Sequence, residues 1–373
     1  MSFLPLEITQ SVPLPNTACE LHVFFQELNQ YGTAATALLE RRGAMVPIIS
    51  TPQGFNEDEL YVDLEPTFGR SLFLKCEGFN FAGSIKLKAA TEMVEAAERD
   101  GVLTPGSILV ESSSGNLGVA LSMIAANRGY GFVCVTDSRC NLSTKRMMQA
   151  LGGQVHVITE PDRIGGFLGA RINYVRALCA SDDRYVWLNQ YYNPQNWKAH
   201  YRKTAPAIAR QFPQLDVLFV GAGTCGTLMG CARYFQEWHR PVRVVAVDSL
   251  GSVTFGGPAG RRMIPGLGTS VCPPMLDQSY LDDVVLVDEA DTIRTCHQLA
   301  RRGFLFGGST GTVISGAMDW LSVNGSDDLT AVAIAPDLGE RYLDTVYHTN
   351  WVLDLYGEDV LGSDELTTAS QSA

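Results

Sequence analysis

The sequence predicts an α/β fold with two doubly wound domains, each built on a parallel sheet. From about residue 70 onward, short runs of apolar and β-branched residues alternate with longer amphipathic segments. Such alternation is typical of parallel strands joined by right-handed helical crossovers. The chain has 373 residues, enough for two cores of moderate size, and its many strands suit two sheets better than one.

The predicted elements follow from local composition. Runs rich in Val, Ile, Leu and Phe predict strands over 71–76, 107–112, 131–137, 154–159, 185–190, 216–221, 243–248 and 330–337. Amphipathic spacing predicts helices over 84–101, 115–129, 143–152, 171–183, 204–212, 226–240 and 311–322. Residues 1–42 fit the alternation poorly, although a helix is predicted over 17–32. The small, polar tail over 362–373 is expected to be disordered.

Composition excludes several classes of protein. The net charge of −12 argues against nucleic-acid binding, which needs clustered Lys and Arg. No run approaches the ~18 apolar residues of a membrane span, and the first residues make a poor signal peptide. Nine cysteines form no C-x-x-C pair, and six histidines form no metal-binding pattern. We therefore expect a cytoplasmic protein with reduced core thiols, no metal and no membrane partner.

A glycine loop follows the predicted strand over 216–221. Gly221, Gly223 and Gly226 spell G-x-G-x-x-G, and Asp248 ends the next strand, as in a dinucleotide-binding fold. That fingerprint normally opens the first βαβ unit of its domain, whereas here it lies past the middle of the chain. The loop therefore indicates a phosphate site, and Asp248 is expected to be a strand-end residue.

One lysine has an unusual position. Lys86 falls in the first turn of a predicted helix, where the helix dipole disfavours its positive charge. A neutral amine is what an imine-forming lysine needs. Lys88 lies about 200° further round the helix and is expected to face solvent.

Two further loops join a strand end or a glycine pair to a helix start. Ser112 to Asn116 offer hydroxyl and backbone N–H groups that suit a carboxylate. A late glycine pair leads to Ser309 and Thr310 at the start of another helix. Each loop alone could be a simple helix cap.

Together these four motifs resemble fold-type II pyridoxal-phosphate enzymes, the relatives of cysteine synthase and cystathionine β-synthase. The resemblance covers about residues 43–345 and rests on S-x-K, S-G-N-x-G, G-T-x-G-T and G-G-S-x-G in that order. It implies pyridoxal 5'-phosphate as cofactor and a homodimer. It also implies a smaller, mobile domain over 78–185, a larger domain made of 43–77 and 186–350, and an N-terminal extension over 1–42.

The resemblance also assigns roles to residues. Lys86 would form the Schiff base, and Ser309, a neutral hydroxyl, would face the pyridine nitrogen, which favours β-elimination and replacement over transamination. Cys225 departs from the glycine common at its position. The cofactor would be bound by Lys86, Asn116, Gly223, Thr224, Cys225, Gly226, Thr227 and Ser309. The substrate α-carboxylate would be bound by Ser113, Ser114, Asn116 and Gln190.

Longer strings such as "EPDRIGGFLGARI" and "WLNQYYNPQNWKAHY" resemble one branch of the family, the N-(2-amino-2-carboxyethyl)-L-glutamate synthases. The branch implies that an activated L-serine, with O-phospho-L-serine favoured, reacts through an aminoacrylate with L-glutamate on the way to 2,3-diaminopropionate, for a siderophore or antibiotic. Arg171 and Tyr191 are candidates for binding the dicarboxylic substrate, Arg171 at its side-chain carboxylate. A cysteine synthase using sulfide and a serine or threonine dehydratase remain alternatives.

Overall fold

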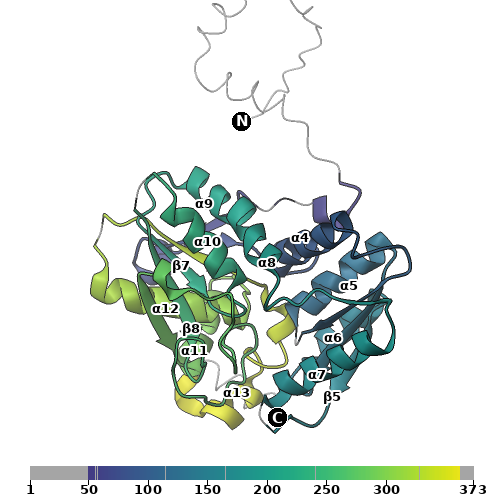
Figure 1. The fold of residues 1–373 in the computed structure, drawn as a ribbon. Helices are drawn as coiled ribbons and strands as arrows, with labels where there is room; N and C mark the ends of the chain where they lie inside the picture. Colours follow the sequence, from purple (N-terminus) through teal and green to yellow (C-terminus); the bar gives the residue numbers. More distant parts are fainter. Residues whose placement is uncertain are drawn as a thin grey trace, which may run out of the picture. The chain divides into compact units, whose positions relative to one another are not determined.

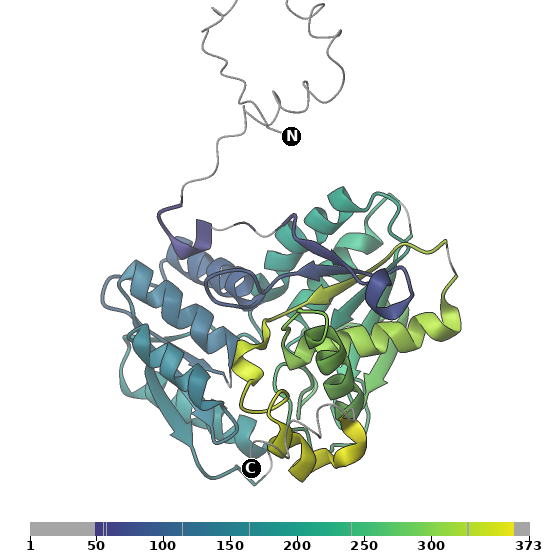
Figure 2. The same ribbon diagram turned by 180° about the vertical axis from the view of Figure 1, so that it is seen from behind.

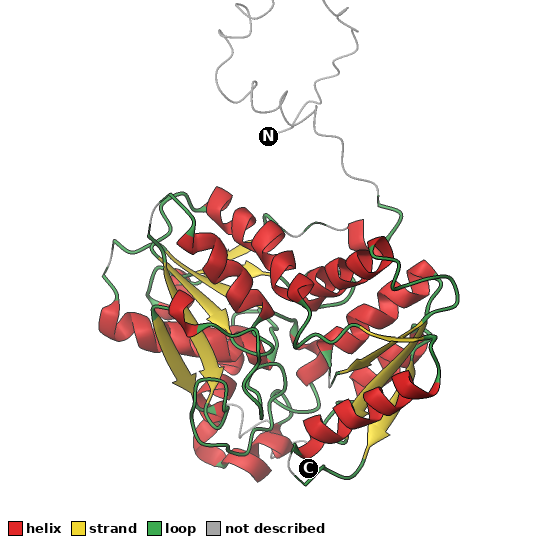
Figure 3. Ribbon diagram, viewed as in Figure 1, coloured by secondary structure: helices red, strands yellow, loops and turns green. Residues whose placement is uncertain are grey.

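The computed structural model describes residues 49–54, 56, 58–113, 115–163, 165–239, 241–326 and 328–361. The predicted N-terminal extension over 1–42, the tail over 362–373 and Ser114 lie outside these ranges. Within them, strands and helices alternate along the chain, as Figures 1 and 3 show. The predicted α/β class is confirmed.

The larger sheet has six strands in the order β1-β2-β10-β7-β8-β9. All neighbouring pairs are parallel except β1 and β2. Figure 2 shows the early strand β2 beside β10, the last strand of the described chain. The strands are β1 (Tyr61–Asp63), β2 (Phe73–Cys76), β7 (Val217–Gly221), β8 (Arg243–Ser249), β9 (Asp283–Val287) and β10 (Ala331–Ala335).

Both faces of this sheet are covered because successive side chains point to opposite sides. Val217 and Phe219 of β7 face one core with α11 and α12, while Leu218 and Val220 face a second core with α9 and α10. A sheet buried on both faces explains the continuous apolar strand sequences. The helices are α8 (Pro194–Ala199), α9 (Ala205–Gln211), α10 (Gly226–Gln236), α11 (Glu289–Ala300), α12 (Gly308–Asn324) and α13 (Thr349–Tyr356), with the short α3 (Glu65–Phe68).

The smaller sheet has four parallel strands in the order β5-β4-β3-β6. Its strands are β3 (Ile108–Ser112), β4 (Gly131–Asp137), β5 (Gln154–Ile158) and β6 (Tyr185–Trp187), and its helices are α4 (Lys86–Arg99), α5 (Asn116–Arg128), α6 (Leu142–Ala150) and α7 (Gly166–Ser181). The two parallel-sheet domains are therefore present. The predicted boundary after residue 185 falls inside β6, and that division of the chain stays a prediction.

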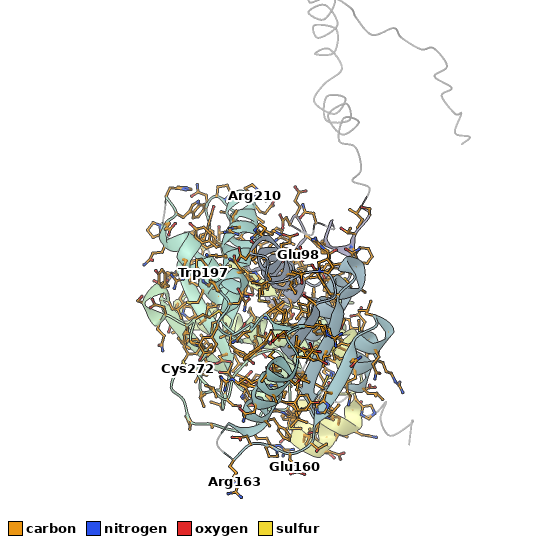
Figure 4. The ribbon with its side chains drawn as sticks, turned by 45° about the vertical axis from the view of Figure 1, so that its right-hand side comes forward. Glu98, Glu160, Arg163, Trp197, Arg210 and Cys272 are labelled. Carbon is orange, nitrogen blue, oxygen red and sulfur yellow. The ribbon has the colours of Figure 1, made fainter. Side chains whose placement is uncertain are left out.

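Short helices complete the described chain. They are η1 (Pro52–Gly54), the π-helix η2 (His200–Thr204), η3 (Gln278–Tyr280), η4 (Gly339–Tyr342) and η5 (Glu358–Val360). Over the described residues, no helix is both long and apolar enough to cross a membrane. Among the described cysteines none forms a disulfide, and only Cys272, labelled in Figure 4, is exposed.

The prediction that Lys88 faces solvent is wrong. Its ammonium group is buried and lies 2.9 Å from Glu77 and 3.1 Å from Asp58. Lys75 lies 3.5 Å from the same Glu77 carboxylate and is also buried. Lys88 does lie on the side of α4 opposite Lys86, as the helical spacing predicted. That side is also covered by other parts of the chain, so Lys88 lies in the interior. This ion cluster joins α4 to the end of β2.

Candidate active site

A cavity lies where strands and helix starts of both sheets meet. This is the usual ligand position in parallel α/β folds, outside the carboxyl ends of the strands. Its inner part is lined by Lys86, Asn116, Gly223, Thr224, Cys225, Gly226, Thr227 and Ser309. Its wider part is lined by Lys86, Ser113, Asn116, Arg171, Gln190, Tyr191, Gly223 and Thr224, together with Arg341 and Tyr342. The structure thus brings together every predicted site residue that it describes.

Lys86 is the first residue of α4, so it lies in the first turn of the helix, as the sequence predicted. Its amine lies in both parts of the cavity. Desolvation by the surrounding protein lowers the pKa of Lys86, while the charge of Asp337 acts in the opposite direction. A lysine with a depressed pKa supplies a neutral amine more readily, which nucleophilic attack on a carbonyl requires.

The loop after β3 begins the α5 helix and forms one wall of the wider cavity. The Ser113 hydroxyl oxygen accepts hydrogen bonds from the backbone of Gly115 at 3.2 Å and Gly118 at 3.0 Å. The Gln190 side chain donates to the Ser112 carbonyl at 2.9 Å, which joins the loop after β6 to the same wall. Ser113 and Gln190 therefore shape this wall.

The glycine loop begins α10. Its Cys225 has φ +64°, a left-handed conformation that glycine adopts without cost, so the cysteine departs from the residue that its backbone favours. Burial raises the pKa of the Cys225 thiol to about 12. The thiol is therefore protonated at neutral pH, and the loop presents backbone N–H groups and hydroxyls.

Asn196 of α8 connects the glycine loop to the opposite wall. Its amide nitrogen donates to the Gln190 carbonyl at 2.8 Å and to the Thr224 hydroxyl at 3.1 Å. His200 directly follows α8. Its Nδ1 lies 3.0 Å from the Thr204 hydroxyl, and its Nε2 lies 3.3 Å from the Thr227 hydroxyl. Burial lowers the pKa of His200 well below its ordinary value, so it stays neutral here. The side chains that support the glycine loop from this side are therefore uncharged.

Ser309 lies in the first turn of α12 and belongs to a hydrogen-bond network. Its hydroxyl donates to Asp337 at 2.6 Å. The same buried carboxylate accepts hydrogen bonds from the Asn116 amide at 2.8 Å and from the Tyr342 hydroxyl at 2.7 Å. Arg341 donates to the Asn116 amide oxygen and to the Ala82 carbonyl. Asp337 thus orients two predicted cofactor ligands that come from different sheets.

Sequence reasoning assigned no role to Asp337, Arg341 and Tyr342. A signal was available, because the charged stretch "PDLGERY" directly follows the apolar strand β10. Polar residues at the carboxyl end of a central parallel strand are good candidates for a ligand site. The contacts of Asp337 and Arg341 to Asn116, which lies more than 200 residues earlier, could not be read from the sequence.

Arg171 and Tyr191 lie together in the wider cavity. Arg171 comes from α7 and is 5% exposed. Its Nε lies 3.5 Å from Asp137, but Nε and Nη1 have no hydrogen-bond partner in the part of the chain that the structure describes. Burial raises the pKa of Tyr191, so its hydroxyl stays protonated. This pair supplies donors to an anionic ligand.

The residues present fit pyridoxal phosphate. The inner cavity combines one amine, a helix N-terminus with successive N–H groups, and a neutral hydroxyl. Glycines keep it open, because a Cβ on Gly266 would lie 3.0 Å from that of Ser309. Likewise, a Cβ on Gly223 would lie 3.0 Å from the Gly266 carbonyl oxygen. The site therefore has the donors and the space that this cofactor requires.

Comparison with known proteins decides the family. A model described as "Pyridoxal-phosphate dependent enzyme" matches residues 61–337. The chain belongs to this family. As a pyridoxal-phosphate-dependent enzyme of fold type II, it takes pyridoxal 5'-phosphate as its cofactor, which confirms the prediction.

Three relatives refine the picture. The chain is 40% identical to N-(2-amino-2-carboxyethyl)-L-glutamate synthase of Ralstonia nicotianae, over 75% of this chain and 83% of that protein. It is 38% identical to the enzyme of that name from Cupriavidus metallidurans, over 78% and 87%. A crystal structure of an O-ureido-L-serine synthase variant with O-ureido-L-serine bound aligns with a TM-score of 0.76 and 30% identity, over 88% and 99%. The predicted resemblance to this branch is confirmed.

Proposed function

We propose that the enzyme replaces the β-substituent of an activated L-serine, with O-phospho-L-serine favoured, by the amine of L-glutamate. The product would be N-(2-amino-2-carboxyethyl)-L-glutamate, a precursor of 2,3-diaminopropionate for a siderophore or an antibiotic. The names of the two curated relatives support this choice. The observation that carries it is the buried Arg171, whose Nε and Nη1 have no hydrogen-bond partner among the described residues and which lines the substrate cavity. Sulfide needs no such cation, whereas a dicarboxylic acid does.

Pyridoxal phosphate, when bound, supplies the electron sink that allows the Cα proton and the Cβ substituent of the serine substrate to leave. Lys86 takes the Cα proton and later returns it, which its lowered pKa favours. The loop with Ser113 and Asn116, together with Gln190, holds the substrate α-carboxylate. Ser309, held by Asp337, keeps a neutral hydroxyl at the cofactor ring.

Two substrates that use one cavity in turn predict ping-pong kinetics. The site must exclude water between the two half-reactions, and we propose that the smaller domain closes over the loop at 112–116 to do so. We also propose that the protein is a cytoplasmic homodimer, as its family implies.

The first test measures the two half-reactions separately. O-Phospho-L-serine alone is expected to shift the visible absorbance of the holoenzyme and release phosphate. Added L-glutamate is expected to restore the starting spectrum and give the C–N-bonded product, detected by mass spectrometry. Restoration by sulfide alone would indicate a cysteine synthase, and release of pyruvate without any nucleophile would indicate a dehydratase.

Arg171→Gln is expected to lower the rate of the glutamate step about hundredfold or more while leaving the phosphoserine step within about threefold, since a charge-assisted pair is lost only in the second step. Arg176→Gln is the matched control, because Arg176 lies on the same helix and is exposed. Equal loss of both steps would remove Arg171 from nucleophile recognition.

A further inference from the structure

The substrate cavity continues into a second space that no predicted role explains. This outer subsite shares six lining residues with the substrate cavity: Arg171, Tyr191, Pro265, Gly266, Gly268 and Thr269. It adds Arg139 and Arg262, neither of which lines the space around Lys86. Three arginines therefore surround one space, and no acidic residue is among its lining residues.

Arg139 already forms an ion pair with Asp137. Its guanidinium donates to both oxygens of Asp137 at 3.2 Å and packs 5.3 Å from the centre of the Phe167 ring. Burial by itself would raise the pKa of Asp137, but the hydrogen bonds from Arg139 and the charge of Arg171 hold it below its ordinary value. Asp137 is therefore ionised and balances about one of the three positive charges.

Arg262 has weaker partners. Its guanidinium donates only to the Leu267 carbonyl at 3.3 Å and to the Ser270 hydroxyl at 3.4 Å, and its Nε is buried without a partner. Among the described residues, no carboxylate lies within ion-pair distance of it. The charge of the buried Asp248 acts on Arg262 more than that of Glu289 does, but Asp248 lies beyond ion-pair distance. Glu289 accepts hydrogen bonds from the backbone of Met263 and Ile264. Arg262 is thus a partly buried cation with unused hydrogen-bond capacity.

The backbone makes room for this side chain. Gly268 has φ +74°, and a Cβ there would lie 2.1 Å from Nη1 of Arg262. The positive φ favours glycine at residue 268, and the missing Cβ leaves space for the Arg262 guanidinium beside this loop. Such a close approach holds Arg262 against the outer subsite.

We propose that Arg262 binds the side-chain carboxylate of the glutamate nucleophile, while Arg171 binds its α-carboxylate. This inference rests on the proposed function. In the new bond, the glutamate nitrogen is attached to Cβ, so its α-carboxylate is near the reacting atoms and its side-chain carboxylate extends further. Arg171 lines both the substrate cavity and the outer subsite, whereas Arg262 lines only the outer subsite. The two arginines therefore follow one another outward from Lys86, as the two carboxylates of glutamate do from the reacting atoms. The side-chain carboxylate, expected at Arg171 from the sequence, is reassigned.

The charges also match. The lining residues Arg139, Arg171 and Arg262, with Asp137 as their ion-pair partner, sum to about two positive charges, not counting Asp248, which acts on Arg262 from beyond ion-pair distance. Glutamate brings two carboxylates. The phosphate of phosphoserine is joined to Cβ through one oxygen and lies nearer the reacting centre. A dianionic phosphate could still use the same arginines, so the experiment must separate these two ligands.

The test compares three nucleophiles with the holoenzyme. L-Glutamine replaces the side-chain carboxylate by a neutral amide, and γ-aminobutyrate lacks the α-carboxylate but keeps the amine. Arg262→Gln is expected to reduce the preference for glutamate over glutamine about ten- to hundredfold, while the preference over γ-aminobutyrate changes little. Arg171→Gln is expected to do the reverse. Arg262→Lys should restore part of the preference, because it keeps the charge.

Arg261→Gln is the matched control, since its neighbouring, exposed guanidinium lies outside the subsite. If Arg262→Gln instead raises the half-saturating concentration of phosphoserine, the subsite binds phosphate and the proposal is overturned. An unchanged preference for all nucleophiles overturns it as well. Failure of the proposed function is distinguishable, because the wild-type enzyme itself would then not use glutamate.

Discussion

At the scale of single residues, Glu111 has the most informative titration. It is the second-last residue of β3, beside the substrate loop. Its carboxylate accepts hydrogen bonds from the Trp187 indole at 2.9 Å, the Ser112 backbone at 2.9 Å and the Gln190 backbone at 3.3 Å. Burial raises the pKa of Glu111 to about 7, although these hydrogen bonds oppose the rise. The folded state therefore binds a proton that the unfolded state releases near pH 4.5.

This raised pKa predicts a pH-dependent stability. The contribution of Glu111 is fully present below about pH 4.5 and is lost as pH rises through about 7, a loss of about 3 kcal/mol. Glu111→Gln does not titrate, so its free energy of unfolding relative to wild type should rise by most of that amount, about 2.5 kcal/mol, between pH 5 and pH 8. Urea unfolding at both pH values measures it. A difference that is independent of pH would contradict the raised pKa.

At the scale of elements, the contact between α8 and α10 supports the glycine loop. A Cβ on Gly226 would lie 2.1 Å from Oδ1 of Asn196, and one on Gly230 would lie 2.4 Å from the carbonyl of Trp197, labelled in Figure 4. The two helices therefore approach closely only because both positions are glycine. Asn196 in turn holds Gln190 and Thr224.

Gly226→Ala is accordingly expected to displace Asn196 and weaken cofactor affinity about tenfold or more, measured by absorbance during titration of the apoenzyme with pyridoxal phosphate. The Asn196→Ala variant should be weakened too. The double variant should be no weaker than Asn196→Ala alone, because the clash disappears. Additive losses would show that the glycine acts in some other way.

Element positions could largely be predicted, since local patterns determine them. The strand predicted over 131–137 is β4, and the helix predicted over 84–101 is α4, which spans Lys86–Arg99. The sequence missed β9, whose run at 283–287 begins with Asp283, and the antiparallel edge strand β1, which has only three residues. Short edge strands lack the long apolar run that reveals a central one.

At the scale of the whole molecule, the ion cluster of Asp58, Lys75, Glu77 and Lys88 joins a helix of the smaller domain to a strand of the larger sheet. Lys88 belongs to the helix that packs on the smaller sheet, and Glu77 follows a strand of the larger sheet. Burial lowers the pKa of Lys75, while the negative charge of Glu77 opposes that effect. The cluster is thus a buried, nearly balanced set of charges.

Glu77→Gln would leave two buried ammonium groups with too little negative charge. The free energy of unfolding is expected to fall by about 3–5 kcal/mol, as when one partner of a buried pair is removed. Glu98→Gln is the control; Glu98, labelled in Figure 4, pairs with the half-exposed Arg128, and its loss should cost less than about 1 kcal/mol. Denaturant titration of wild type and both variants measures these free energies of unfolding. Similar losses in the two would indicate that the cluster does not hold α4 to the larger sheet.

The residues of the site could be predicted more easily than the contacts that join them across the molecule. The resemblance to fold-type II enzymes predicted that Lys86, Asn116 and Ser309 belong to one site. The carboxylate that links Asn116 to Ser309 was not predicted, because a contact across more than 200 residues depends on how the two sheets are arranged. Arg262 was missed for the same reason, since its role depends on Gly268 and on the neighbouring arginines.

The hydrogen bond between Trp187 and Glu111 has a practical consequence. The indole shares its acceptor with the backbone of Ser112 and Gln190, which border the substrate α-carboxylate in our proposal. Ligand binding at that loop therefore alters the electric field around a natural fluorophore. With the other four tryptophans replaced by phenylalanine, the emission of Trp187 would become a label-free optical signal for each substrate as it arrives.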